Sequence, residues 1–242
     1  QGYFGKEAIV VFLNGASGDV TQVDNLSPLR NRDPEPWAAF VGGRVGAEAL
    51  KVLLTMDRGI LIPIETRTKV WPIRRRVPDP QRVQRCLDIV QQTEAKVGHT
   101  EWIFAKEIVL LDAKIRKEPT VPVEVQAIQI GPAVFLTTPA EYFCAFGLEQ
   151  KKRSGFPFTF PVSLANGCVG YVPTEEAFSE RGGGYETRLT SYSNLEMTAG
   201  TQMMEAGIEL ARALKPGPIP SRGPAPPFRG PWSYGDVRPE IK

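Results

Sequence analysis

The sequence predicts an α/β fold: a mixed sheet flanked by helices over residues 1–215, followed by an extended Pro/Gly-rich tail over residues 216–242. Two observations support the domain. Short apolar or alternating runs, which are typical of strands, are interspersed with longer segments of helical period. Glycine and proline separate these segments. The third observation concerns the tail: its proline and glycine content cannot build a core, so we expect it to lie extended, either free or strapped across a neighbour.

The composition argues against several classes of protein. The 242 residues suffice for one large domain or two small ones, and 42% hydrophobic residues is ordinary for a globular protein. The net charge of +2 predicts no particular partner. The basic clusters at 74–76 and 151–153 lack interleaved aromatic residues, so we expect no nucleic-acid binding. No apolar run approaches the roughly 20 residues of a membrane span.

The three cysteines, Cys86, Cys144 and Cys168, form no CxxC motif, and their odd number argues against a full disulfide framework. Cys86 and Cys144 fall on apolar helix faces and are predicted to be buried thiols. The chain begins at Gln1 without an initiator Met or a signal peptide, and it enters an apolar run almost at once. We therefore expect it to be a piece of a longer protein.

The first predicted strand, residues 7–13, runs into a loop of small residues that ends at Thr21. Gly15 and Gly18 let the backbone N–H groups of this loop approach an anion or a metal-bound oxygen. The loop lacks the Lys-Ser/Thr pair of a Walker motif. A plain glycine turn after a strand is the alternative interpretation.

The next part of the chain alternates between helices and strands. A helical period starts at Asp33-Pro34 and ends near Met56, and Asp79-Pro80 begins a second helix. Two strands are predicted between these helices, over residues 60–64 and 66–77. The segment from 99 to 117 fits either a helix or a strand.

The stretch from 121 to 171 organises the rest of the prediction. Strands are expected over 121–130, 133–136 and 156–164, with a helix between the last two. That helix has Thr138 as its predicted N-cap and Glu141 three residues later, in the pattern of a capping box. A strand that turns directly into a helix places Glu141 at the carboxyl edge of a sheet, where α/β proteins bind ligands.

The remainder of the domain is a glycine-rich loop and a helix. A glycine-spaced segment ends at Tyr171, and a polar loop with three glycines at 182–184 follows. Such a loop is either a mobile lid or plain surface. Ser193 and Glu196 form a second capping-box pattern, which predicts a helix from there to about Lys215.

Three residues are candidates for chemistry because of their joint placement. Glu141, Tyr171 and Asp19 each follow an apolar strand and adjoin glycines or a tight turn, as residues at the mouth of one sheet would. Each also has a purely structural explanation: a cap, a strand aromatic and a turn residue, respectively.

His99 is the only histidine and lies at a predicted helix end, so a Ser-His-Asp triad is not indicated. Zinc sites usually contain imidazole, which no other residue of this chain can supply.

A resemblance to a known family adds to these residues. The motifs that carry it are Asn14 to Thr21 followed by Asp24-Asn25, then 137–142, then 165–176, and finally Tyr185-Glu186. In this order they resemble the neutral/alkaline (non-lysosomal) ceramidase family. The resemblance spans most of residues 1–215, and its best parts are the Pro-x-Glu and Asn-Gly-x-x-Gly-Tyr-Val blocks. The chain looks most similar to a short, largely uncharacterised bacterial branch of that family.

The resemblance implies a zinc-dependent amidohydrolase in which Zn²⁺ activates a water against an amide or ester bond. Glu141 and Tyr171 match the family's Glu and Tyr metal ligands. Thr21 matches a serine beside the metal, and Asp19 with the N–H groups of Gly15 and Gly18 would orient it. The two histidine ligands belong to a half of the fold that this chain lacks. The resemblance further implies a lipid-like or other small-molecule substrate and an exported, periplasmic or extracellular protein.

The chain departs from the family pattern in ways that leave two functions open. Thr21 replaces serine and Ala140 replaces glycine, and the family's histidine-bearing half and C-terminal β-domain are missing. Residues 1–215 would then be the C-terminal portion of a catalytic domain. The histidines would come from the N-terminal portion of the same precursor or from a second subunit. The alternative is a non-catalytic binding or structural subunit that keeps the ceramidase-like fold. A metal-free hydrolase with a Thr21 nucleophile is a weaker third reading, because it lacks a base.

Overall fold

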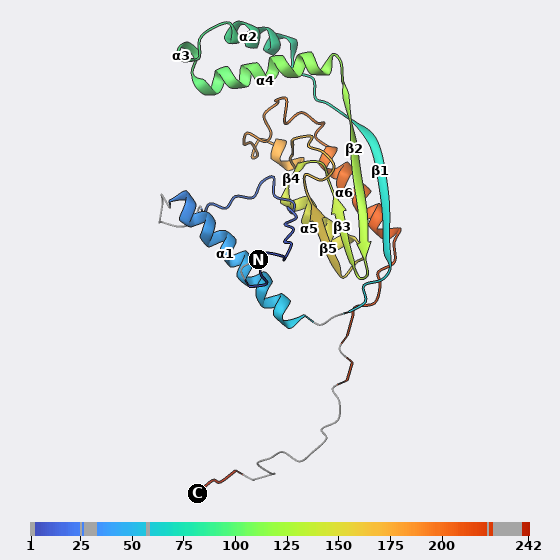
Figure 1. The fold of residues 1–242 in the computed structure, drawn as a ribbon. Helices are drawn as coiled ribbons and strands as arrows, with labels where there is room; N and C mark the ends of the chain where they lie inside the picture. Colours follow the sequence, from blue (N-terminus) through green and yellow to red (C-terminus); the bar gives the residue numbers. More distant parts are fainter. Residues whose placement is uncertain (1–2, 25, 27–32, 57–58, 222, 225–238) are drawn as a thin grey trace.

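The fold is built around a four-stranded mixed sheet, seen in a computed structural model that describes residues 3–24, 26, 33–56, 59–221, 223–224 and 239–242 (Figure 1). The strand order is β1-β2-β3-β5. The strands are β1 (Ile64–Arg74), β2 (Thr120–Ile130), β3 (Ala133–Thr137) and β5 (Phe158–Val162). Neighbouring strands are antiparallel except for the parallel pair β3–β5. The predicted α/β class with a mixed sheet and flanking helices is confirmed.

Two helices cover one face of this sheet. They are α5 (Cys144–Arg153) and α6 (Ala199–Arg212). On β2, residues at every second position point to this face and are fully buried, which is the period that a half-buried strand requires. They pack with α6 side chains such as Met203 and Ile208 in the main core cluster. The α5–α6 layer therefore supplies the burial that stabilises the sheet.

A helical arm separates β1 from β2 and projects at the top of Figure 1. It consists of α2 (Pro80–Val90), α3 (Glu94–Val97) and α4 (His99–Ile115), so the ambiguous segment 99–117 is a helix. Asp79 accepts a hydrogen bond from the Arg82 N–H (2.9 Å) and thereby caps α2 as predicted. The arm has a small core of its own, which includes Cys86 and Ile108.

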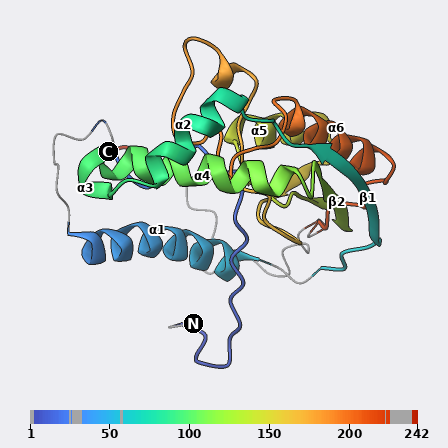
Figure 2. The ribbon, with the colours of Figure 1, turned by 90° about the horizontal axis from the view of Figure 1, so that it is seen from above.

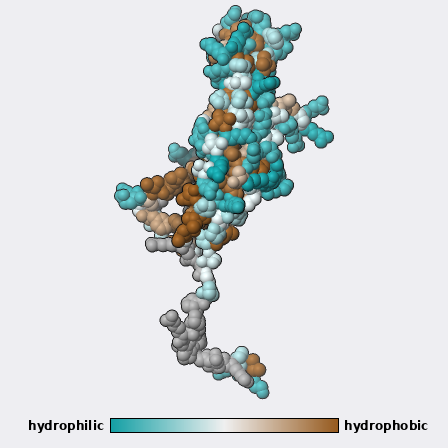
Figure 3. Space-filling model, turned by 90° about the vertical axis from the view of Figure 1, so that its right-hand side faces the viewer, coloured by the Kyte–Doolittle hydropathy of each residue, from teal (hydrophilic) through white to brown (hydrophobic). Residues whose placement is uncertain are grey.

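The first helix, α1 (Pro34–Thr55), matches its predicted bounds but contains no buried residue. It stands off from the sheet when the molecule is viewed from the front and from above (Figures 1 and 2). Its apolar side chains, among them Val45, Val52 and Leu53, are about half exposed. Seen from the side, hydrophobic surface gathers at the level of α1 (Figure 3).

The sheet face opposite α5 and α6 also carries apolar side chains that the described residues leave open. Phe135 of β3 stacks on Phe160 of β5, with ring centroids 5.1 Å apart. Phe158 and Phe160 remain 44% and 46% exposed. These rings line a groove of about 590 Å³ together with Met56 and Leu61. We call this surface, formed by Phe135, Phe158 and Phe160, the open face.

Several predicted elements are corrected. Residues 7–13 are irregular rather than a strand, and Ile9 and Phe12 are among the most exposed apolar side chains. Within the described residues no strand pairs with this segment, and the Ala8 N–H instead donates to the nearby Gly5 carbonyl (3.3 Å). Residues 60–63 are likewise irregular, because pairing with β2 begins only at Ile64. Cys144 is half-buried rather than buried, whereas Cys86 is buried as predicted.

The last helix also begins later than predicted. Ser193 and Glu196 do not form the predicted capping box: the Ser193 hydroxyl donates to the Glu186 carbonyl, and the Glu196 carboxylate accepts from the Gln202 side chain (2.9 Å). Helix α6 starts at Ala199 instead.

The tail begins against the sheet, where the Gly217 N–H donates to the Gly131 carbonyl (3.0 Å). Most of the predicted tail, residues 222 and 225–238, lies outside the described residues.

The core between the sheet and α6 leads to a first prediction. Leu136→Ala removes a fully buried side chain from a cluster with Phe156 and Leu214, so it should lower the free energy of unfolding by about 2–5 kcal/mol. Val70→Ala on β1, a residue that is 57% exposed, is the matched control and should change it by less than about 1 kcal/mol. Urea unfolding followed by circular dichroism measures both. Equal effects would contradict the assignment of this face as the core.

Candidate functional site

The candidate site is centred on two very short parallel strands. Strand β4 (Glu141–Tyr142) pairs with β6 (Tyr171–Val172), and Glu141 and Tyr171 are directly opposed in the register. The predicted helix start at Thr138 is therefore wrong, since α5 begins only at Cys144. The two residues expected to converge, thirty positions apart in sequence, do lie side by side.

Backbone pairing explains why residues 138–141 do not form a helix. The carbonyl of Thr138 accepts from the Ala165 N–H (3.0 Å), and the carbonyl of Pro139 accepts from the Val169 N–H (2.7 Å). The Glu141 N–H donates to the Gly170 carbonyl (2.9 Å). A helix beginning at Thr138 would need these same backbone groups. Because they are bonded to the segment 164–170, the helix does not form there.

The loop that makes these bonds is tightly turned. Leu164 and Asn166 both have positive φ angles, of 57° and 61°, and Gly170 has a φ of 88°. The Asn166 side chain donates to the Glu124 carboxylate on β2 (2.7 Å), which fixes the loop to the sheet. A Cβ at Gly170 would overlap the backbone of Tyr192, so glycine is required there.

The phenol of Tyr171 lies between two polar neighbours. Its hydroxyl is 3.2 Å from the hydroxyl of Tyr185, and the two rings meet edge to face at 5.3 Å. Hydrogen bonding to Tyr185, then burial, and then the Glu141 carboxylate raise the pKa of Tyr171 well above its ordinary value. The Glu141 and Tyr171 side chains are each half-buried, so both remain accessible at one edge of the fold.

Tyr185 is a site residue to which sequence reasoning assigns no role. It is 51% exposed and lies just after the glycine run 182–184. A glycine run ending in an aromatic residue was the available signal. It does not reveal, however, that the loop returns to Tyr171.

The small-residue loop from Asn14 to Asp19 lies against this pair of strands. The Gly18 N–H donates to the Tyr142 carbonyl (2.8 Å), and a Cβ at Gly18 would come within 2.8 Å of the Glu141 carbonyl carbon. Asp19 accepts from the Cys144 N–H (2.6 Å) and so serves the N-terminus of α5. The loop is therefore next to the candidate ligands, as its predicted role requires.

The contacts of the other loop residues are more local. Thr21 is exposed, and its hydroxyl accepts from the Val23 N–H (3.2 Å). Within the described residues, the Asp19 carboxylate accepts from the Cys144 N–H, and no hydrogen bond joins it to Thr21. Gly15 has space around it, since a Cβ there would be 4.0 Å from the Pro161 carbonyl oxygen. Asn25, part of the motif after Thr21, lies outside the described residues.

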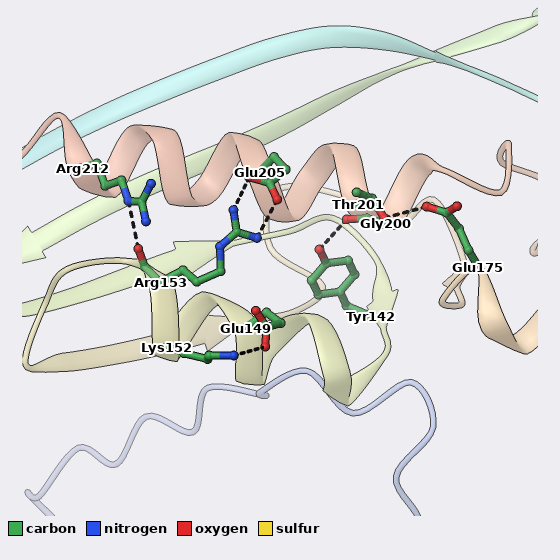
Figure 4. Close-up of polar contacts among 9 residues, drawn as sticks. All are labelled: Tyr142, Glu149, Lys152, Arg153, Glu175, Gly200, Thr201, Glu205 and Arg212. Atoms are coloured by element: carbon green, nitrogen blue, oxygen red, sulfur yellow. Dashed lines mark hydrogen bonds and ion pairs between the residues drawn. The ribbon is translucent and has the colours of Figure 1, made fainter.

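Contacts that β4 and α5 make with α6, one buried and one exposed, lie behind the site (Figure 4). Tyr142, next to Glu141, is fully buried and donates its hydroxyl to the Gly200 carbonyl (2.7 Å). Burial raises the pKa of Tyr142 well above its ordinary value, so this phenol stays protonated. Arg153 and Glu205 form a two-point ion pair at 2.6 and 2.7 Å between the same helices.

Two side chains of the site are of kinds that can bind metal ions. Glu141 and Tyr171 offer two oxygen donors side by side, a chemistry compatible with Zn²⁺. Among the described residues, no group of three or more His, Cys, Asp and Glu side chains could hold a metal ion. His99 lies on the helical arm, where its ring contacts Glu94, and does not belong to this site.

Comparison with known proteins places the fold. No family model matches the chain, and no curated protein matches it. The neutral ceramidase of Pseudomonas aeruginosa is similar over 86% of this chain and 38% of its own, with a TM-score of 0.50 and 14% identity. This chain has a ceramidase-like fold. A second solved structure, described as a ceramidase complexed with C2, matches over 44% of this chain and 17% of its own, at 19% identity and a TM-score of 0.33.

The chain spans well under half the length of these ceramidases. Within the part of the chain that the structure describes, no helix is long and apolar enough to cross a membrane. The ceramidase-like fold thus accounts for the arrangement of strands, while the chemistry depends on the individual side chains.

The two glycines of the small-residue loop give a matched pair of variants. Gly18→Ala places a Cβ against the Glu141 carbonyl and should lower the free energy of unfolding by about 1–3 kcal/mol. Gly15→Ala meets open space and should change it by less than about 0.5 kcal/mol. Thermal and urea unfolding of the two variants test this. A Gly18→Ala protein as stable as Gly15→Ala would mean that the loop does not rest on β4.

Proposed function

We propose that this chain is the C-terminal portion of a ceramidase-like, zinc-dependent hydrolase that cleaves an amide or an ester bond. The substrate class that we infer is a ceramide-like N-acyl lipid or a related small molecule. The observation that supports this is the direct pairing of Glu141 with Tyr171 at the edge of a ceramidase-like fold. Burial and strong core packing behind Tyr142 make this edge rigid enough for such a role.

Glu141 and Tyr171 would hold the Zn²⁺ ion. When bound, Zn²⁺ supplies a water with a pKa near 7 and polarises the carbonyl of the substrate. Tyr185 keeps the Tyr171 hydroxyl in one orientation through their contact at 3.2 Å. These two phenols and the Glu141 carboxylate are the polar groups of this chain that face the proposed reaction.

The loop residues have different parts in this proposal. Thr21 retains the hydroxyl that a serine would provide, and it is exposed toward the solvent. Asp19 holds the N-terminus of α5, so it positions the loop and does not itself face Thr21. The Gly18 N–H is used by the Tyr142 carbonyl, so Gly18 serves close packing. Gly15 remains the candidate for an N–H directed at substrate.

The missing imidazoles would come from a companion polypeptide, either the N-terminal portion of the same precursor or a second subunit. A second copy of this chain has only His99, which lies on the helical arm and contacts Glu94. The match covers 38% of the similar ceramidase, so most of that protein lies outside the matched part. The companion would correspond to that unmatched part.

The open face is where we expect the companion to dock. One face of the sheet is covered by α5 and α6, whereas the other presents apolar rings where the solvated face of a largely antiparallel sheet would carry polar residues. Phe135 and Phe160 are stacked on the uncovered side, beside the loop that contains Gly15 and Ala16. Exposed apolar groups on this scale mark interaction surfaces.

The metal assignment is tested in the assembled protein, in which this chain is joined to its companion. Glu141→Gln and Tyr171→Phe should each reduce bound zinc, measured by atomic emission, and lower hydrolysis of N-acyl and ester substrates by at least 100-fold. Glu149→Gln, an exposed residue of α5 paired with Lys152, is the control and should bind zinc normally. Normal zinc content and activity in both site variants would refute the assignment.

The docking surface has a separate test. Phe160→Asp places a charge on the open face and should abolish co-purification and co-sedimentation with the companion polypeptide, because an unpaired charge at an apolar interface is costly. Leu110→Asp, on the exposed side of α4, is the control and should assemble normally. If Phe160→Asp assembles with the companion but abolishes a dimer of this chain, the open face instead binds a second copy.

A non-catalytic binding or structural subunit is the second candidate function. The absence of a three-residue metal cluster among the described side chains favours it, as does the local contact of Thr21. Zinc bound by the assembled protein independently of Glu141 and Tyr171, without hydrolysis of any substrate, would support this alternative.

A further inference from the structure

The end of β1 continues into two arginines that hold the loops of the candidate site. Arg75 forms an isolated antiparallel bridge with Leu195, and the Arg76 N–H donates to the Asn194 carbonyl (2.6 Å). The Arg75 guanidinium donates to the Asn194 side-chain oxygen (2.6 Å). The Asn194 amide in turn donates to the carbonyls of Thr190 and Ser191, at 3.1 and 2.8 Å. The segment 190–195 is therefore fixed to the end of the sheet.

Arg76 makes contacts of a different kind. Its guanidinium donates to two carbonyls on opposite sides of one loop, Thr187 (3.3 Å) and Ser193 (2.9 Å). Its flat face lies over the ring of Phe178, 4.7 Å from the centroid. One side chain thus joins the loop segment after Tyr185 to the loop segment that contacts Tyr171.

Both tyrosines of the site are tied to this bridged loop. The Tyr171 N–H donates to the Tyr192 carbonyl (2.9 Å), one residue before Ser193. On the other side, the Ser193 hydroxyl donates to the Glu186 carbonyl, one residue after Tyr185. The Arg188 N–H also donates to the Tyr185 carbonyl (3.2 Å). The separation of the two phenols is thus set by the loop that Arg76 closes.

We propose that Arg76 is a positioning residue that holds the Tyr185 hydroxyl against the Tyr171 hydroxyl. The positional part of this inference rests on the contacts described above. Its consequence for catalysis rests on the proposed function. Arg75 anchors the same loop through Asn194, but Arg76 alone joins the Thr187 and Ser193 carbonyls.

The electrostatics of Arg76 support a specific role. Burial, and next the nearby charge of Arg82, lower the pKa of its guanidinium to about 10. Among the described residues, it forms no ion pair, and its Nε is buried without a hydrogen-bond partner. Burying part of a cation without a carboxylate partner costs hydration free energy, which the hydrogen bonds to the two carbonyls must offset. An apolar side chain would fill the same space beside Phe178 but could not bridge the two carbonyls.

A spectroscopic experiment on this chain tests the positional step without a metal or a companion. The tyrosines are replaced biosynthetically by 3-fluorotyrosine, and the ¹⁹F resonance of residue 185 is assigned with Tyr185→Phe. Arg76→Met should move that resonance in the same direction as Tyr171→Phe does, because both changes remove the contact between the hydroxyls. Arg74→Met, at the exposed residue two positions earlier, should leave the resonance unchanged.

A second variant covers the case in which Arg76→Met does not fold. Arg76→Lys keeps the charge but cannot span both carbonyls, so it should produce a smaller shift in the same direction. Circular dichroism establishes that each variant is folded. A Tyr185 resonance at its original position in the folded Arg76 variants would overturn the proposal.

The catalytic consequence is measured in the assembled protein by a double-mutant cycle. Arg76→Met should reduce kcat by roughly 10- to 100-fold with little change in KM, since a misplaced group costs about this much. In a Tyr185→Phe background, Arg76→Met should have no further effect on kcat. Independent, multiplicative losses would overturn the inference that Arg76 acts through Tyr185. An inactive assembly would refute the proposed function and leave the ¹⁹F result standing.

Discussion

The exchange of backbone hydrogen bonds between residues 138–141 and residues 164–170 is the constraint on which the site depends. It converts a segment with strong helix-start signals into the short strand β4, and it places Glu141 opposite Tyr171. Each bond is worth only about 0.5–1.5 kcal/mol in net terms, but leaving these buried groups unpaired would cost more. The pairing thus satisfies backbone groups of both segments.

Close backbone packing limits what this arrangement can tolerate. Gly18 and Gly170 lie where a Cβ would overlap Glu141 and Tyr192, respectively, so the close approach at these two places requires glycine. Such close contacts between backbone segments hold the neighbouring side chains in place. The Tyr171–Tyr185 contact depends on the same loops, which explains why a residue as distant in sequence as Arg76 can influence it.

The sequence predicts the strands and helices whose pattern is decided locally. The alternation of β2, the apolar run of β3 and the Asp79 cap of α2 all depend on neighbouring residues, and each was predicted correctly. The two failed capping boxes, at Thr138 and Ser193, are different. Their local signals are genuine, but long-range partners use the same groups: Ala165 takes the Thr138 carbonyl, and Arg76 the Ser193 carbonyl.

The same distinction applies to the candidate site. The convergence of Glu141 and Tyr171 was predicted because both follow strands, and strand ends meet at one edge. The place of Tyr185 in the site was not predicted, because it depends on a loop that is closed by contacts from residues 76, 190 and 193. Zinc binding and the origin of the histidines remain predictions from the resemblance, because the described residues contain only two of the donors.

The open face and the candidate site share one structural element, which couples them. The loop with Gly15 and Ala16 lines the same apolar hollow as Phe135 and Phe160, and three residues later Gly18 rests on Glu141. A companion that covers these rings would press the loop onto β4 as it buries apolar area. Each buried CH₂ contributes about 0.8 kcal/mol, so this contact would add to the hydrogen bonds that hold the loop. Because Gly18 and Asp19 are already bonded to residues 142 and 144 in this chain, covering the open face would reinforce an arrangement that the loop has on its own.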